Sequence, residues 1–203
     1  MPSAERARVA AVVLAAGSSS RMGRNKLLLD LGGQTVVRRA VRATLDAGVD
    51  RVVVVLGHEA ERVRSELAGL DCDVVVNPDH AQGVGTSLHT GIARASTDAD
   101  AIVVILADMP FVSGDMIGSV VQRYRESGAR LVLSRYGDVQ APPTLYAREL
   151  FAEVLAVPDE RCGKQVVRRH QDEAVTVTWP EAALRDIDVA ADYELVRSEL
   201  AGA

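Results

Sequence analysis

Five short apolar runs divide the first two thirds of the chain, and each is rich in valine, isoleucine and leucine. Within a run the apolar residues follow one another with little alternation. This pattern is typical of strands buried on both faces of a mostly parallel sheet. We expect these strands at residues 9–14, 51–56, 72–76, 101–106 and 130–134.

The segments between these runs repeat apolar residues at spacings of three and four, which predicts helices. They cover residues 36–44, 59–67, 87–95 and 115–124, and Ser113 is a candidate N-cap for the last of them. Strands that alternate with helices indicate a three-layer α/β/α, Rossmann-like domain with right-handed crossovers.

The pattern loosens after Tyr136. Residues 137–143 are turn-rich, and the adjacent Pro142 and Pro143 predict that no central strand runs through them. Helices are expected at 147–155, 163–170 and 190–200, with a strand at 174–178. We therefore expect one domain over 1–203, in which the second part adds a small antiparallel extension.

Composition and charge narrow the class of protein. The 203 residues are 48% hydrophobic and 25% charged, the balance of a folded globular domain. A net charge of −5 gives no basic footprint for a nucleic acid. Cys72 and Cys162 show neither disulfide nor metal-ligand spacing. No apolar run is long enough for a membrane span, and the first ends in a polar loop rather than a signal-peptide cleavage site, so we expect a cytoplasmic protein.

The first strand runs directly into the segment 14–26, Leu-Ala-Ala-Gly-Ser-Ser-Ser-Arg-Met-Gly-Arg-Asn-Lys. Its small residues let a backbone approach a ligand closely, and successive N–H groups can form a concavity for anions. Arg21 and Lys26 are placed to neutralise a polyphosphate, and Lys26 is one of only two lysines beside 21 arginines. The segment matches neither of the common glycine-rich phosphate motifs. An ordinary solvated loop is the alternative.

Other polar residues follow later strands, where ligands bind in open α/β sheets. Asp108 comes after the fourth strand. A carboxylate there is costly to bury unless it meets a partner such as Mg²⁺, although a turn or a helix cap is an alternative. Asp186 and Asp188 alternate along one segment near the C-terminus, and either could be a second metal ligand or a helix cap. After the third strand, a glycine-punctuated loop leads from Asn77 into a helix start, which favours anions and polar groups.

Together these motifs resemble those of the MobA-like NTP transferases, over nearly the whole chain. The segment 14–26 is similar to the family signature L-A-x-G-x-S-x-R-M-G-x-x-K, and Asp108-Met109-Pro110 matches the family's D-M-P motif. The residues 186–192 resemble its terminal D-[IV]-[DN]-x-P-x-D, with Ala190 in place of the proline.

The resemblance implies a nucleotidyltransferase fold, with a nucleotide-binding part up to about residue 135 and an acceptor side over about 136–203. It implies catalytic roles for Arg21, Lys26 and Asp108, and Mg²⁺ ligation by Asp108 and Asp188. It implies nucleotide binding by a set of residues in the loops after the strands: Leu14, Ala15, Ala16, Gly17, Arg21, Lys26, Asn77, Gly83, Ser87 and Asp108. An ionised acceptor phosphate needs no general base, so His58 and His80 are not required.

The resemblance also bears on the two substrates. The stretch 82–88, Gln-Gly-Val-Gly-Thr-Ser-Leu, is similar to the cytidylyltransferase branch of the family, which favours CTP as donor and molybdopterin as acceptor. A transient contact with a molybdoenzyme or its chaperone follows from that role. On the acceptor side, Ala141-Pro142-Pro143 replaces the family's G-H-P, so a sugar or polyol phosphate stays an alternative acceptor, and a non-catalytic nucleotide-binding or cofactor-binding protein stays an alternative role. Pro143, Lys164 and Asp186 are the acceptor-side candidates.

Overall fold

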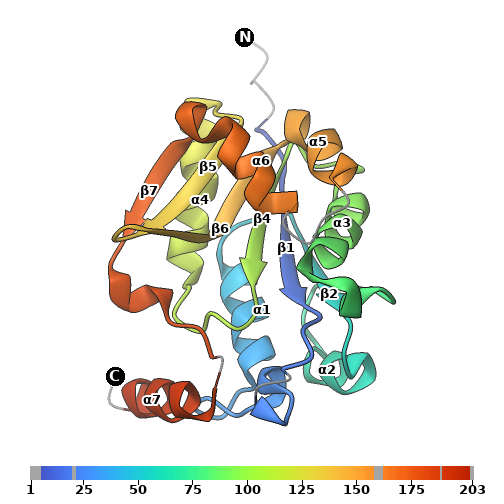
Figure 1. Cartoon of the computed structure of the whole chain (residues 1–203), viewed down its shortest axis with the longest axis vertical. Coiled ribbons are helices and arrows are strands. Elements are labelled where there is room, and N and C mark those ends of the chain that lie inside the picture. The colour runs from blue at the N-terminus through green and yellow to red at the C-terminus, as the bar shows by residue number, and fades with distance from the viewer. Residues whose placement is uncertain (1–5, 20–21, 158–161, 188, 202–203) are drawn as a thin grey trace.

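The computed structural model describes residues 6–19, 22–157, 162–187 and 189–201. Seven strands form one sheet in the order β3-β2-β1-β4-β6-β5-β7 (Figure 1). Six of them run parallel, and only β6 runs in the opposite direction. The strands are β1 (Val9–Ala15), β2 (Arg51–Leu56), β3 (Asp73–Val76), β4 (Ala101–Leu106), β5 (Leu131–Tyr136), β6 (Val139–Ala147) and β7 (Val175–Trp179).

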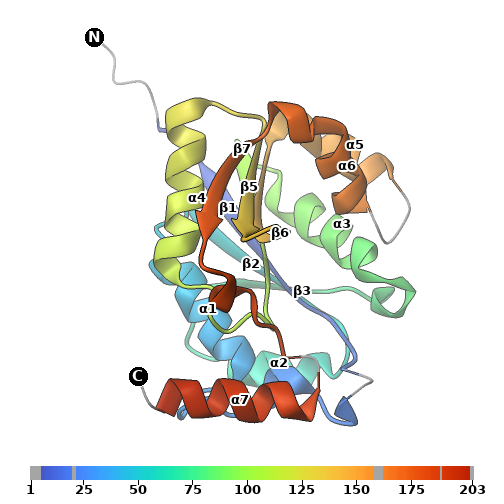
Figure 2. The ribbon, with the colours of Figure 1, turned by 60° about the vertical axis from the view of Figure 1, so that its left-hand side comes forward.

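Helices cover both faces of this sheet, so the expected three-layer α/β/α architecture is confirmed (Figure 2). On one face lie α1 (Val36–Asp46), α2 (Ala60–Glu66) and α4 (Gly114–Ser127). On the other lie α3 (Val84–Ala95), α5 (Phe151–Ala156) and α6 (Cys162–His170). The last helix, α7 (Ala190–Ala201), packs near the end of the sheet at which β1 and β4 stop.

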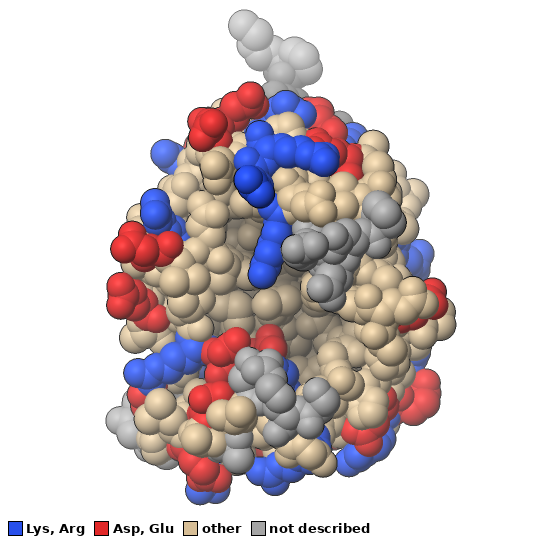
Figure 3. All heavy atoms as spheres, in the orientation of Figure 1, with Lys and Arg blue, Asp and Glu red and all other residues tan. Residues whose placement is uncertain are grey.

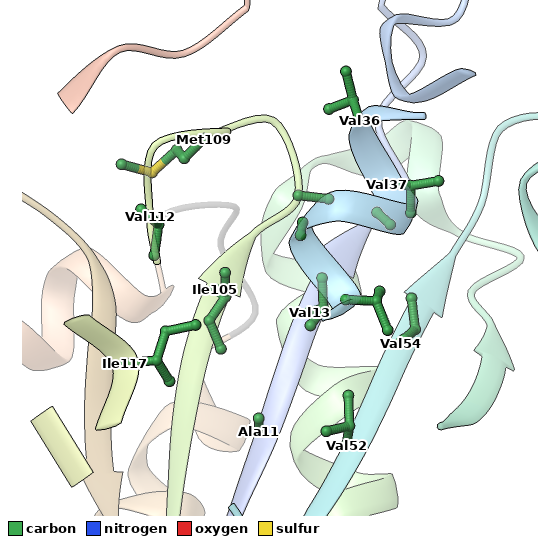
Figure 4. Packing of buried hydrophobic residues seen from close by; sticks show 14 of the residues in the cluster. Ala11, Val13, Val36, Val37, Val52, Val54, Ile105, Met109, Val112 and Ile117 are labelled. Atoms are coloured by element: carbon green, nitrogen blue, oxygen red, sulfur yellow. The ribbon is translucent and has the colours of Figure 1, made fainter. Parts of the chain in front are cut away.

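The lack of alternation in the apolar runs has a direct structural cause. Successive side chains of a strand point to opposite faces, and here both faces are core. In β1, Ala11 and Val13 pack with α1 and α4, whereas Val12 and Leu14 pack with α3. Figure 4 shows the first of these two clusters, with side chains from β1, β2 and β4 against α1 and α4. Burial on both faces fixes these strands firmly.

The prediction that residues 137–143 hold no central strand is wrong. β6 includes Pro142 and Pro143 and lies between β4 and β5. The physical reason is local, because β6 pairs with β4 only as far as Thr144. On its other side, the pairing with β5 shifts register between Val132 and Ser134. The two prolines fall in this irregularity, where no ladder hydrogen bond is required of them.

The other expected elements are present, with ends that differ by a few residues. Ser113 caps α4 as predicted, since its side chain accepts a hydrogen bond from the backbone N–H of Met116 (3.2 Å). Among the described residues, no helix combines the length and the apolar character that crossing a membrane requires.

Candidate functional site

A pocket of about 600 Å³ opens beside the carboxyl ends of β1 and β4. Leu14 and Leu106 line it at these strand ends, and the start of α3 contributes Val84, Gly85 and Leu88. The hairpin of β5 and β6 and one side of α6 form the opposite wall. Figure 3 shows the hollow near the centre of one face, with basic side chains above it and acidic ones below. Its position agrees with the rule that ligands bind at the carboxyl edge of such sheets.

The loop after β1 leaves the sheet beside this pocket. Ala15 and Ala16 are buried, whereas Gly17 is exposed. Ser19 has a φ of 53°, and its hydroxyl accepts a hydrogen bond from the backbone N–H of Lys26 (3.1 Å). The loop therefore turns back on itself and delivers Lys26 to a fixed place. Arg21, predicted to bind phosphate, lies outside the described residues.

Two residues without a predicted role hold this loop. Asn25 is 6% exposed, and its side-chain oxygen accepts from the N–H of Leu27 (3.1 Å), which starts the short helix of residues Lys26–Leu28. Ser19 is the second, through the contact just described. Both lie inside the predicted motif, and the capping preference of asparagine was the available signal for Asn25.

Lys26 and Asp108 meet in space. The Lys26 Nζ lies 2.5 Å from Asp108 Oδ2, and the two side chains are 13% and 23% exposed. The end of β4 is tied to β1 by a hydrogen bond from the N–H of Ala107 to the carbonyl of Leu14 (3.1 Å). Two residues 82 positions apart in the sequence thus form one charged centre at the ends of β1 and β4.

The C-terminal segment reaches the same strand end. The backbone N–H of Ile187 donates to the carbonyl of Asp108 (3.1 Å), and the Ile187 side chain is fully buried. Asp186 is exposed on this segment. Asp188, the predicted second metal ligand, lies outside the described residues.

The carboxylate of Asp108 suits a hard divalent cation. Its oxygen already contacts a positive charge, and Mg²⁺ is typically held by one or two carboxylates together with substrate phosphates. Within the described part of the chain, no three His, Cys, Asp or Glu side chains are grouped to hold a metal. Asp108 could hold such an ion together with phosphate oxygens.

The loop after β3 is built around a buried amide. Asn77 is 2% exposed, and its side-chain nitrogen donates to the hydroxyls of Thr86 (2.8 Å) and Ser87 (2.9 Å). Its oxygen accepts from the N–H of Asp79 (3.0 Å). Asn77 and Ser87 thus satisfy each other and fix the loop against α3.

Gly83 precedes α3 with a φ of 121° and a ψ of 167°, a conformation that essentially only glycine adopts. This turn brings the next two residues, Val84 and Gly85, to the pocket wall. The residues of this loop that line the pocket are thus Val84 and Gly85, which lie next to the predicted Gly83 and Ser87 in the sequence.

Of the residues predicted for the acceptor side, some line the pocket and others do not. Lys164 lines the pocket. Pro143 is buried behind the wall, and its carbonyl accepts from the Ser134 hydroxyl (2.7 Å), while Ala141 and Pro142 face the pocket. Arg168 also lines the pocket and was missed.

The comparisons with known proteins agree with this arrangement. The model of the MobA-like NTP transferase domain matches residues 11–175. This chain belongs to that family. It is 30% identical over 198 residues to the purine catabolism protein PucB of Bacillus subtilis, covering 92% of this chain and 94% of PucB.

Solved structures are similar over nearly the full length. Rv0371c of Mycobacterium tuberculosis has a TM-score of 0.85 and 27% identity, over 95% of this chain and 98% of its own. Its complex with manganese has also been solved. A nucleotidyl transferase from Methanothermobacter (Mth528) has a TM-score of 0.81 and 28% identity, over 96% of this chain and 98% of its own. The chain is a nucleotidyltransferase of the MobA-like family.

In this nucleotidyltransferase, the tyrosines near the pocket are unsuited to acid–base work. Burial raises the pKa of Tyr136 and of Tyr146 well above the ordinary value. Both hydroxyls donate to carbonyls instead, Tyr136 to Pro142 (2.8 Å) and Tyr146 to Gly163 (3.5 Å). They stay protonated and hold the wall in place.

His58 and His80 lie beside the loop after β1, where the backbone N–H of His58 donates to the carbonyl of Ala16 (3.2 Å). Their ring centroids are 6.3 Å apart. His58 lines a separate hollow with Ser18, Arg24 and Glu59. Neither histidine lines the main pocket.

Proposed function

We propose that this nucleotidyltransferase transfers CMP from CTP to the phosphate of molybdopterin and releases pyrophosphate, with Mg²⁺ as its metal. The observation that carries the transfer reaction is the contact of Lys26 with Asp108 at the carboxyl edge of the sheet. The cation would neutralise phosphate oxygens of the triphosphate, and the carboxylate beside it would hold the metal ion that accompanies them.

The chemistry requires positioning and charge neutralisation more than proton transfer. An oxygen of the acceptor phosphate attacks the α-phosphorus of CTP. The bond from the α-phosphorus to the oxygen that bridges the α- and β-phosphates then breaks, and pyrophosphate leaves. Lys26, once released from Asp108, would hold β- and γ-phosphate oxygens, and Arg21 would do the same. Asp108, with Asp188, would hold Mg²⁺, which neutralises charge on the phosphates when it is bound.

The loop after β1 supplies the second requirement, which is a fixed geometry. Ser19 and Asn25 fix the turn from which the Lys26 side chain extends. Catalysis by preorganised charge depends on such fixed groups, because no reorganisation is then needed in the transition state.

The choice of CTP and molybdopterin rests on the similarity of residues 82–88 to the cytidylyltransferase branch. One observation favours a second candidate, another phosphorylated acceptor: Ala141 and Pro142 line the pocket in place of the family's Gly and His. This difference lies on the acceptor side and leaves the nucleotide side untouched.

The test is Mg²⁺-dependent pyrophosphate release with CTP, GTP, ATP or UTP, each with and without molybdopterin. We expect release with CTP only when molybdopterin is present. Release with CTP and a sugar phosphate, but not with molybdopterin, would establish the second candidate. Equal release with GTP and CTP would contradict the nucleotide assignment.

A further inference from the structure

The helix α6 is held against the pocket in one fixed orientation. Two of its own residues, Cys162 and Val166, are fully buried against the core. A side-chain carbon added to Gly163 would lie 3.1 Å from Leu88 Cδ2 and 3.2 Å from the Tyr146 hydroxyl. Gly163 therefore lies close against α3 and β6, and the buried Cys162 and Val166 set which face of the helix is turned to the pocket.

That face carries residues at helical spacing: Gly163, Lys164, Val167, Arg168 and Gln171. Lys164 and Arg168 are four positions apart, so they are neighbours on the helix surface. Two like charges at this spacing repel each other, which makes the pair unfavourable for the helix alone. Both residues are exposed at the rim of the pocket, and an anion bound between them would relieve this repulsion.

No described side chain of the protein supplies an anion to Lys164 and Arg168, so a bound ligand would have to supply it. Neither Lys164 nor Arg168 makes an ion pair or a hydrogen bond with any residue that the structure describes. The next residue, Arg169, contacts Glu153 (2.9 Å), and so does His170 (2.7 Å). No described Asp or Glu lines the pocket, although the chain as a whole has a net charge of −5.

The wall beneath the cations is largely hydrocarbon. Leu88, Leu133, Pro142 and Val167 contribute to it, together with the strand-end leucines of β1 and β4. Hydroxyls of a polyol buried against these apolar side chains would lack partners, which is costly. The uncharged polar side chains that also line the pocket are Ser134, Gln140, Thr144 and Gln171. An uncharged ring system would be buried there favourably.

We propose that Lys164 and Arg168 bind the phosphate of the acceptor as a two-point clamp, with an apolar or aromatic body of that acceptor in the pocket below. Arg168 thereby becomes a specificity residue of the acceptor site, and the clamp with its apolar pocket favours the phosphorylated ring system of the proposed function over a sugar or polyol phosphate. The inference rests on the proposed function for the identity of this pocket as the acceptor site.

The first experiment measures binding without nucleotide, by isothermal titration calorimetry with 1-naphthyl phosphate and with glycerol 3-phosphate. We expect 1-naphthyl phosphate to bind the full chain more tightly. Arg168→Ala should weaken that binding roughly 10-fold or more, because a hydrogen bond to a charged group is lost. Arg169→Ala is the matched control, since this arginine is already paired with Glu153, and it should change the affinity less than about 2-fold.

Three results would overturn the proposal: equal losses in Arg168→Ala and Arg169→Ala, tighter binding of glycerol 3-phosphate, or no binding of 1-naphthyl phosphate at millimolar concentration. Thermal melting of each variant shows whether it is folded, and Arg168→Lys, which keeps the charge, should recover part of the affinity.

Turnover separates this inference from the proposed function. In pyrophosphate release, Arg168→Ala should raise the KM for the acceptor and leave the KM for CTP unchanged. Absence of turnover in the unmodified protein, with the Arg168-dependent binding intact, would refute the proposed reaction and leave the anion clamp standing. Turnover with an acceptor KM that does not respond to Arg168→Ala would refute the clamp alone.

Discussion

Asp108→Asn removes one negative charge from the contact with Lys26 and keeps the size of the side chain. At 2.5 Å and an effective dielectric constant of about 20, the Coulomb attraction between the two unit charges is about 7 kcal/mol. Desolvation and side-chain entropy offset most of this attraction. Exposed pairs contribute about 0.2–1 kcal/mol, and breaking a buried pair costs about 3–5 kcal/mol.

The pair lies between these limits, since its side chains are 13% and 23% exposed. We therefore expect Asp108→Asn to lower the free energy of unfolding by about 1–3 kcal/mol. For a chain of this size, that corresponds to a fall in Tm of roughly 2–4 °C per kcal/mol. Thermal melting without nucleotide measures this effect.

The effect on activity should be larger, because the carboxylate is proposed to hold the metal. We expect the rate of pyrophosphate release to fall on the order of 10²–10³-fold, by analogy with the loss of one preorganised charge-stabilising group. Asp98→Asn is the matched control: Asp98 lies just before β4, at the opposite end of the same strand, and pairs with Arg8 at 3.5 Å. Its turnover should stay near that of the unmodified chain.

The double variant Lys26→Met/Asp108→Asn closes a mutant cycle. If the contact exists in the free protein, the two losses of stability should not add, because each single change already breaks the pair. Turnover of Asp108→Asn within about threefold of the unmodified protein would refute the assignment of Asp108 to the metal. Additive stability losses would refute the contact itself.

Three further outcomes are expected. Asn77→Ala should lower the free energy of unfolding by about 1–3 kcal/mol, because it leaves buried groups without partners, and raise the KM for nucleotide; urea unfolding and steady-state kinetics check both. Gly91→Ala should destabilise by about 1–3 kcal/mol, because the added carbon would clash with Val12 Cγ1, and unchanged melting would contradict the packing described. Burial raises the pKa of Asp50, but the hydrogen bond from the N–H of Val9 and the nearby arginines outweigh it and lower the pKa overall. The ionised carboxylate therefore stabilises the fold above the unfolded pKa of 3.8, and this contribution is lost as pH falls through the lower folded pKa. The difference in unfolding free energy between the unmodified protein and Asp50→Asn should accordingly shrink below about pH 4.

The strands of the first half could be predicted from the sequence because both of their faces are core. Val12 and Val13 point to opposite faces, and each meets its own layer of helices. The charged centre could be predicted for a related reason: the carboxyl ends of parallel strands share one edge, so residues following β1 and β4 must converge. Lys26 and Asp108 are the pair that this rule brought together.

Other parts of the site depend on tertiary contacts that no local pattern encodes. The amide of Asn77 looked available to a ligand in the sequence, but it is used by the start of α3. Arg168 stood four residues after Lys164, yet this spacing acquires meaning only once the core has fixed which side of α6 faces the pocket. The β6 strand was missed because the proline rule was applied to an ideal ladder rather than to one that is interrupted.

That interruption in β6 also explains how the sheet accommodates a pocket. β4 continues its pairing with β1 through Leu106, but its pairing with β6 stops at Val104 opposite Thr144. Pro142 and Pro143 have no N–H to extend the ladder, so the two strands part, and Pro142 and Leu106 become walls of the pocket.

Where the ladder is interrupted, backbone carbonyls of β6 lose their partners in the neighbouring strand, and burying them without a hydrogen bond would be costly. Side chains of β5 satisfy them, since Ser134 donates to the carbonyl of Pro143 (2.7 Å) and Tyr136 donates to that of Pro142 (2.8 Å). These hydroxyls let the strand leave the ladder without unpaired buried groups. The departure of this segment from the family's Gly-His-Pro is therefore more than a change of lining residues, because Pro142, which lines the pocket, also helps to set how far the sheet opens.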